Sequence, residues 1–211
     1  MRALMTAGLI WLMGSLALVQ AQEAAPYREG THYVALPSPA STEEPDKIEV
    51  AELFWYGCGH CFNLDPLIRE WKKDLPEDVH FREVPALFGG PWNLHGQLFY
   101  TLESLGKLEE THQVVFNAMH REGKRLASEE EMIALLQPHG ITEEEFRKTW
   151  RSFGVRSKMD QAGRLARSYR ATGVPTLIVN GKYRIEGAMA GSLEEMLKVA
   201  EYLVEQERQQ M

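Results

Sequence analysis

The sequence is poor in cysteine: its 211 residues contain only two, Cys58 and Cys61. Without a second cysteine pair, a structural zinc site is disfavoured, because such sites normally take four ligands. His95, His112 and His120 could complete a zinc site, but they stand on separate helix-like segments without paired spacing. A purely structural disulfide is also disfavoured, because closing so short a loop removes little entropy from the unfolded chain. The pair is therefore predicted to be chemically active.

The sequence also lacks an excess of basic residues, and beyond its first 21 residues it lacks a long apolar run. Its net charge of −7 argues against nucleic acid as a partner. Residues 1–21 combine Arg2, an apolar stretch and a final small residue, which predicts a signal peptide cleaved after about Ala21. The alternative is an uncleaved membrane anchor, but a span needs about twenty apolar residues. Export to an oxidising compartment would let a disulfide persist.

Both cysteines lie where a predicted strand gives way to a predicted helix. The near-continuous apolar run Ile48–Tyr56 indicates a strand buried on both faces. From residue 62 to about residue 73, apolar side chains recur at helical spacing. Cys58 is thus placed at a helix N-terminus, where unpaired N–H groups and the helix dipole favour a thiolate.

These positions suggest separate roles for the two thiols. Cys58 is the predicted nucleophile, and Cys61, about one turn along and facing inward, is the predicted resolving thiol. An imidazolium at His60 would lower the pKa of the Cys58 thiol further. A stabilised thiolate is also a good leaving group, which makes the disulfide form oxidising.

The rest of the chain reads as one α/β unit interrupted by helices. A second strand is predicted over 79–84, an all-helical stretch over about 93–171, and a hairpin joined by Asn180-Gly181 before a final helix. Ser128, Thr142 and Ser192 are each followed three residues later by glutamate, the pattern of a capping box. We predict a first α/β part at 22–92, an inserted helical domain at 93–171 and a second α/β part at 172–211.

Two motifs resemble a known family. The stretch Trp55–Cys61, which reads WYGCGHC, and the stretch Gly173–Thr176, which reads GVPT, are similar to those of DsbA-type thiol:disulfide oxidoreductases. The resemblance implies an α/β thioredoxin fold with an inserted all-helical domain. Gly59 is a departure, because DsbA-type enzymes commonly carry Pro-His between the cysteines, whereas Gly-His is typical of eukaryotic protein disulfide isomerases.

The resemblance also implies further site residues. It implies that Pro175 is cis and faces the active-site disulfide, and that Val174 offers backbone groups to an extended substrate. Gly59 is expected beside that substrate. Glu52 occupies the position of a buried glutamate that would relay protons to the resolving thiol, although it could instead be solvated at a sheet edge. The family often sets a lysine near this glutamate on the adjacent strand. That strand has no lysine here, and Arg82 is the candidate substitute.

The resulting hypothesis is an exported oxidase that donates its Cys58–Cys61 disulfide to unfolded exported proteins with free cysteines. It would need no cofactor beyond that redox-active disulfide, and no metal. The resemblance implies the periplasm as its location and a quinone-linked inner-membrane protein of the DsbB type as its reoxidant. We expect a monomer, because 37–46 is too short for a dimerisation domain. The alternatives are a reductase or isomerase of the same fold, a non-enzymatic chaperone for unfolded chains, and zinc binding.

Overall fold

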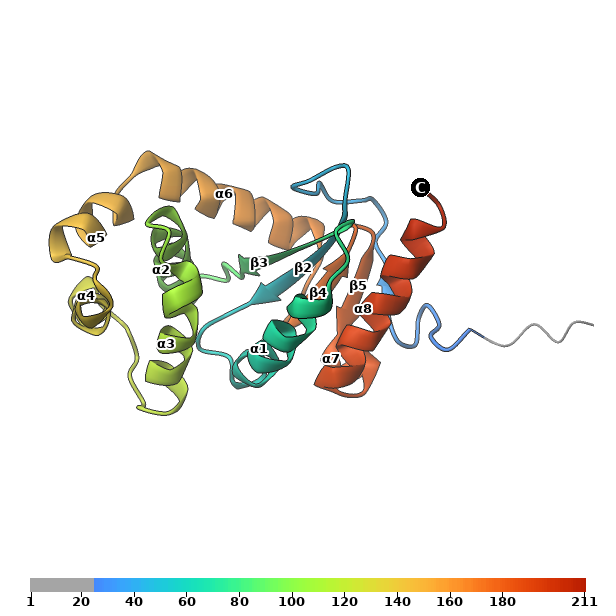
Figure 1. Cartoon of the computed structure of the whole chain (residues 1–211), viewed down its shortest axis with the longest axis horizontal. Helices are drawn as coiled ribbons and strands as arrows, with labels where there is room; N and C mark the ends of the chain where they lie inside the picture. Colours follow the sequence, from blue (N-terminus) through green and yellow to red (C-terminus); the bar gives the residue numbers. More distant parts are fainter. Residues whose placement is uncertain (1–24) are drawn as a thin grey trace, which may run out of the picture.

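The computed structural model describes residues 25–211 and contains one five-stranded sheet (Figure 1). The predicted signal peptide lies outside these residues. The strands stand in the order β1-β5-β4-β2-β3, and only the β2–β3 pair is parallel. Their bounds are Val34–Ala35 (β1), Ile48–Phe54 (β2), Val79–Pro85 (β3), Thr176–Val179 (β4) and Tyr183–Glu186 (β5).

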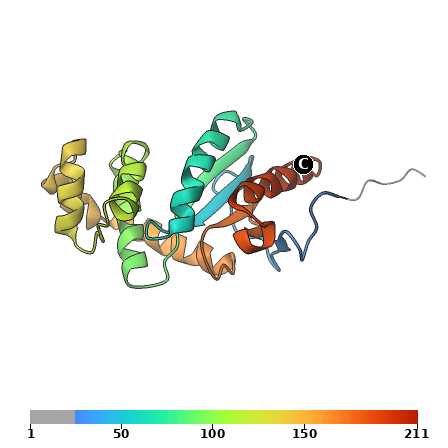
Figure 2. The ribbon, with the colours of Figure 1, turned by 90° about the horizontal axis from the view of Figure 1, so that it is seen from below.

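Helices cover both faces of the sheet and extend beyond one end of it (Figures 1 and 2). One apolar cluster joins α1 and α8 to one face, and a second joins α6 to the other. The remaining helices of the insertion, α2 to α5, gather beyond the sheet. The bounds are Gly59–Trp71 (α1), Pro91–Ser104 (α2), Leu108–His120 (α3), Glu129–Leu136 (α4), Glu143–Trp150 (α5), Phe153–Ser168 (α6), Gly187–Ala190 (α7) and Leu193–Arg208 (α8), with short 3-10 helices at Lys72–Asp74 (η1) and Gln137–His139 (η2).

The strand that leads to the cysteines is buried along its whole length. All seven residues of β2 are buried, as the apolar run predicted. β2 pairs with β3 on one side and β4 on the other, so its carboxyl end is held within the sheet. No helix within residues 25–211 is long and apolar enough to cross a membrane.

Local signals in the sequence set several element boundaries. The side chains of Ser128, Thr142 and Ser192 each cap a helix as predicted, although only Thr142 and Glu145 form the full reciprocal box. Asn180 and Gly181 both adopt positive φ, at 48° and 63°, which suits the predicted hairpin turn. The short helix α7 follows β5 directly and was not predicted from the sequence.

Candidate active site

Cys58 is the N-cap residue of α1. Its backbone is extended, with φ −91° and ψ 117°, and its Sγ accepts a hydrogen bond from the Cys61 N–H at 3.2 Å. Both cysteines are free thiols, so the site is in its dithiol form. Cys58 is partly exposed, whereas Cys61 is fully buried. The predicted placement at the helix N-terminus is confirmed, and only Cys58 presents its sulfur to an approaching reactant.

The surroundings shift the pKa values of the two thiols in opposite directions. The hydrogen bond from the Cys61 thiol is the largest influence on Cys58, and with the Cys61 and His60 N–H groups it outweighs burial and lowers the pKa of Cys58 to about 6. Burial raises the pKa of Cys61 well above its usual range, and the hydrogen bond to Cys58 and the charge of Glu52 act in the same direction. At neutral pH the site therefore holds one thiolate and one thiol.

The two residues between the cysteines are exposed. The charge of His60 lowers the pKa of Cys58, but its influence is smaller than that of the hydrogen bonds. Gly59 is the first residue of α1, and a Cβ built on it would meet no heavy atom within 4 Å. The space beside the cysteines is therefore open at Gly59.

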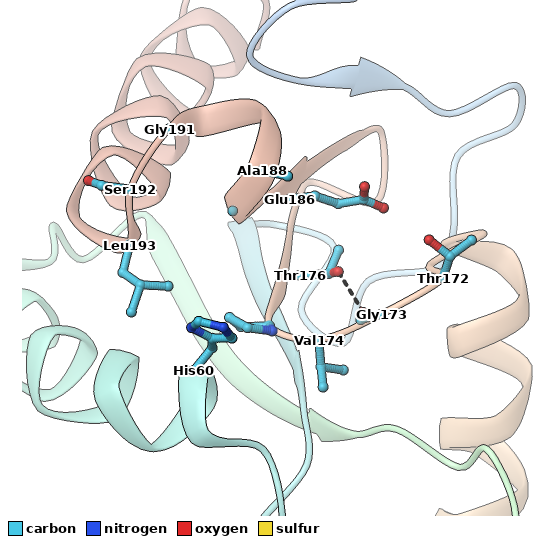
Figure 3. Close-up of a pocket in the computed structure, with 12 residues that line it drawn as sticks. His60, Thr172, Gly173, Val174, Thr176, Glu186, Ala188, Gly191, Ser192 and Leu193 are labelled. Carbon is cyan, nitrogen blue, oxygen red and sulfur yellow. Dashed lines mark hydrogen bonds between the residues drawn. The ribbon is translucent and has the colours of Figure 1, made fainter.

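A groove runs from His60 along the loop before β4 (Figure 3). The Val174–Pro175 peptide bond is cis, as the resemblance implied, and the Val174 carbonyl oxygen lies 3.5 Å from the Cys58 Sγ. The groove has a volume of about 510 Å³ and continues past Val174 and Pro175 to Leu193. The structure thus brings Cys58, His60, Val174 and Pro175 together at one opening.

Glu52 lies in the central strand β2 with an exposed fraction of 4%, so the alternative of a solvated residue at the sheet edge is wrong. Burial is the largest cause that raises the pKa of Glu52, and the charges of Glu83, Asp65 and Cys58 add to it. The charge of Glu52 also raises the pKa of Cys61. A buried carboxyl group with a raised pKa therefore lies close enough to both cysteines for their charges to interact.

Arg82, the candidate partner of Glu52, does not pair with it. Aligned residues of neighbouring strands share a face of the sheet, and the register of β2 with β3 aligns Ala51 with Arg82 and Glu52 with Glu83. Arg82 therefore lies on the opposite face, where its guanidinium is 3.1 Å from a Glu49 carboxylate oxygen. The charge that favours the ionised form of Glu52 comes instead from Lys72, just after α1.

Two histidines of α3 hold Tyr56, the residue two positions before Cys58. The Tyr56 hydroxyl lies 2.9 Å from His112 Nδ1, and His120 Nε2 lies 2.7 Å from the Tyr56 carbonyl oxygen. Tyr56 is 1% exposed, and burial lowers the pKa of His112 to about 4, so His112 is neutral. Sequence analysis missed these contacts, because His112 and His120 stand among the apolar residues of α3 without a motif.

The histidines considered for a zinc site have other partners. His112 and His120 contact Tyr56, and His95 Nδ1 accepts a hydrogen bond from Trp55 Nε1 at 2.9 Å. Within residues 25–211, the group of side chains spaced as metal ligands is Asp65, Glu83 and His112, whose ligand atoms lie within 4.8 Å of one another, and it includes neither cysteine. His112 Nε2 is 3.5 Å from the Asp65 carboxylate and 3.8 Å from that of Glu83, so the packing of one histidine against two acids accounts for this spacing.

The fold and the site together define a class of protein. A thioredoxin-like sheet, a Cys-x-x-Cys pair at the start of its first long helix and a cis-proline loop against the first cysteine are the features of a thiol:disulfide oxidoreductase. Comparison with known proteins gives the family. The model of the DSBA-like thioredoxin domain matches residues 70–198, and the chain belongs to the DsbA family.

Curated relatives and solved structures agree with this family. The thiol:disulfide interchange protein DsbA of Pseudomonas aeruginosa is 51% identical over 188 residues, which is 89% of each chain. DsbA of Azotobacter vinelandii is 51% identical over 191 residues, covering 90% of this chain and 89% of that relative. The crystal structure of Pseudomonas aeruginosa DsbA has a TM-score of 0.83 and 52% identity, covering 86% of this chain and 95% of the other. The chain is therefore a thiol:disulfide oxidoreductase with the DsbA fold, including its helical insertion.

Proposed function

We propose that this oxidoreductase works as a dithiol oxidase that donates its Cys58–Cys61 disulfide to exported proteins. A client thiolate attacks the Cys58 sulfur, a mixed disulfide forms, and Cys61 leaves. A second client thiolate then attacks the client sulfur of the mixed disulfide and releases Cys58 as a thiolate. The client gains a disulfide, and the enzyme keeps the two electrons as a dithiol.

The opposite pKa shifts of the two thiols are the observation that carries this proposal. A thiolate stabilised to a pKa of about 6 is a good leaving group, so Cys58 gives up a client sulfur readily. Its stability also favours the dithiol product over the disulfide, which makes the disulfide oxidising. Cys61, buried and with a raised pKa, is suited to act only within the molecule as the resolving thiol.

The neighbouring residues have supporting roles in this proposal. His60 adds a positive charge beside the Cys58 thiolate. The buried acid of Glu52 passes a proton to or from Cys61 as the disulfide opens or closes. An extended client lies along the cis-proline loop, with backbone groups of Val174 pairing to it by β-addition, Pro175 shaping the loop and Gly59 leaving room beside the cysteines.

The proposal extends to the surroundings of the enzyme. The chain acts in the periplasm after cleavage of residues 1–21, as a monomer with an α/β part at 22–92, a helical domain at 93–171 and a second α/β part at 172–211. Its cysteine pair needs no separate cofactor or metal. A quinone-linked inner-membrane protein of the DsbB type returns it to the disulfide form.

The first experiment is the equilibrium of the cysteine pair against a graded series of reduced and oxidised glutathione. We expect a potential on the oxidising side, towards about −120 mV, the strongly oxidising end of this fold's range. A value towards about −270 mV, where reductases of the fold lie, would favour the reductase or isomerase alternative, to which the Gly59-His60 pair would then point.

A second experiment tests the roles of the two cysteines. Cys61→Ala should accumulate mixed disulfides with clients through Cys58, because the resolving thiol is gone. Cys58→Ser should form none and should abolish exchange. Recovery of clients on Cys61 in the Cys58→Ser protein would reverse the assignment, and full biological activity of Cys58→Ala would favour a chaperone that only holds unfolded chains.

A further inference from the structure

A second opening, which we call the Trp55 pocket, lies in the helical insertion beside the active-site turn. It has a volume of about 770 Å³, within the range of ligand pockets. Leu94 of α2, Met119 of α3 and Trp55 supply its apolar surface, and Lys124 and Arg125 lie at its edge. Its lining shares no residue with the groove along the cis-proline loop.

The Trp55 pocket is directly connected to the reactive cysteine. The Cys58 N–H donates to the Trp55 carbonyl oxygen at 2.9 Å, so the residue that lines the pocket also closes the turn before α1. Trp55, three residues before Cys58, lines this pocket, and His60, two residues after Cys58, lines the cis-proline groove. Viewed from below, the start of α1 stands between the insertion and the cis-proline loop (Figure 2). A polypeptide joined to Cys58 therefore has one opening on each side.

Hydrogen bonds and stacking hold the pocket in shape. Trp55 Nε1 donates to His95 Nδ1 at 2.9 Å, which leaves the proton of neutral His95 on Nε2, 3.2 Å from the Arg125 carbonyl oxygen. Burial lowers the pKa of His95, so this arrangement persists at neutral pH. Trp92 stacks on Trp55 with ring centroids 4.0 Å apart. A pocket already ordered loses little conformational freedom when it binds.

The edge of the pocket is basic in an otherwise acidic protein. Lys124 and Arg125 are exposed, while the whole chain carries a net charge of −7. Lys124 has an ion pair with Glu122 at 2.8 Å. No carboxylate within residues 25–211 lies within 4 Å of the Arg125 guanidinium, so its charge is available to a partner. An apolar cavity with a cation at its edge is complementary to a large apolar side chain next to an acidic one.

We propose that the Trp55 pocket is a second client subsite, which takes a large apolar side chain of the polypeptide while Arg125 pairs with an acidic residue beside it. The inference rests on the proposed function in one respect: the occupant of the pocket is a client polypeptide that exchanges with Cys58. It names a client class: chains that carry an apolar residue next to an acidic residue near the reacting cysteine. Such a chain would lie across both openings, with its cysteine over Cys58.

The test measures how fast cysteine peptides reduce the oxidised enzyme. One peptide series carries a Phe-Glu pair at successive positions on each side of the cysteine, and a matched series carries Ser-Lys at the same positions. At the favoured position we expect Phe-Glu to react about tenfold faster, the scale of discrimination that an apolar pocket provides. Met119→Trp, which places a bulky ring in the cavity, should reduce this preference.

Arg125→Glu tests the charged edge separately. It should reduce the Phe-Glu advantage roughly threefold, as for one exposed ion pair, and the reduction should shrink at high salt. Arg164→Glu is the matched control, because Arg164 is an exposed arginine on α6 outside this pocket. All three variants should react normally with dithiothreitol, which is uncharged and too small to need the pocket. Unfolding curves check that Met119→Trp is folded.

Several outcomes would overturn the inference. The proposed subsite would be excluded by equal rates for the two peptide series. It would also be excluded if Arg125→Glu and Arg164→Glu had equal effects on the Phe-Glu advantage. Met119→Trp or Arg125→Glu could instead change the sedimentation of the protein without changing its peptide preference. That result would indicate that this surface is a contact between copies of the chain. The glutathione equilibrium fixes the direction of exchange independently, so a failure of the oxidase proposal is distinguishable from a failure of the subsite.

Discussion

At the scale of single residues, the active site is an arrangement of two identical groups in different surroundings. Cys58 is partly exposed and receives hydrogen bonds at a helix N-terminus, whereas Cys61 is 0% exposed and has a pKa raised by burial and by the charge of Glu52. The fold therefore determines which sulfur reacts with an external thiol. It also links the two thiols, because the largest single influence on the pKa of Cys58 is the thiol of Cys61.

This link predicts that Cys61→Ala raises the pKa of Cys58 from about 6 towards the ordinary cysteine value of about 8.5. Ultraviolet absorbance of the thiolate, followed during a pH titration, measures the shift. His60→Ala should raise the same pKa by less, because the charge of His60 is a smaller influence than the Cys61 thiol. A larger shift in His60→Ala than in Cys61→Ala would contradict this order.

The sequence could identify the residues whose roles follow from a short motif. The spacing of Cys58 and Cys61 after a buried strand indicated the site, and the resemblance located Pro175. It could not pair Arg82 correctly, because only the strand register shows that Arg82 and Glu52 lie on opposite faces. The contacts of Tyr56 with α3 join residues 56 and 64 positions apart, so no local pattern predicts them.

At the scale of elements, the position of Gly59 at the start of α1 predicts that proline can replace it. Proline is favoured at the first position of a helix, and the Cys58 thiolate is stabilised by the N–H groups of Cys61 and His60 rather than that of Gly59. Gly59→Pro should therefore leave the pKa of Cys58 near 6 and stabilise the protein by about 0.4–1 kcal/mol. Thiolate titration and urea unfolding test both statements, and a pKa near that of free cysteine would contradict the first.

Helix α3 connects the helical insertion to the active-site loop. Because the Asp65 carboxylate faces His112 Nε2, the proton of His112 belongs on that nitrogen and the Tyr56 hydroxyl donates to Nδ1. His112→Leu leaves this buried hydroxyl without its partner, so the free energy of unfolding should fall by about 1–3 kcal/mol. Urea denaturation measures the loss. Tyr56→Phe combined with His112→Leu should cost less than the sum of the single changes, and strict additivity would exclude the contact.

The elements themselves were largely predictable because their signals are local. The buried strand β2, the capped helices and the Asn180-Gly181 turn each follow from a few adjacent residues. The arrangement of the insertion was not predictable in the same way. Apolar stripes show that its helices are buried on one side, but contacts between distant segments, such as α2 with α6, determine where they pack.

At the scale of the whole molecule, the redox state of the cysteine pair is linked to stability. The pKa of Cys58 is lowered to about 6 in the folded dithiol protein, against about 8.5 in an unfolded chain. A lowered pKa contributes stability that is present above about pH 8.5 and is lost as the pH falls through about 6. Cys58 should thus contribute at most about 3 kcal/mol.

This linkage predicts a pH-dependent difference between the two redox forms. The disulfide form has no Cys58 thiolate, so the stability of the dithiol protein relative to it should increase between pH 6 and about 8.5. Urea unfolding of both forms across this range measures the increase. Parallel pH profiles for the two forms would contradict the lowered pKa. Cys58→Ser, which cannot form the disulfide, should lack the increase seen for the dithiol protein.

The edges of the sheet have a consequence for a protein of the DsbA family, which acts on other proteins. An open strand edge can recruit an extended chain and begin aggregation. Here one edge is β1, only two residues long, and the other is β3, which carries His80, Arg82 and Glu83. His80 Nδ1 lies 2.9 Å from a Glu44 carboxylate oxygen, and Arg82 forms an ion pair with Glu49. Short or charged edges allow the protein to work among unfolded chains without becoming a template for them.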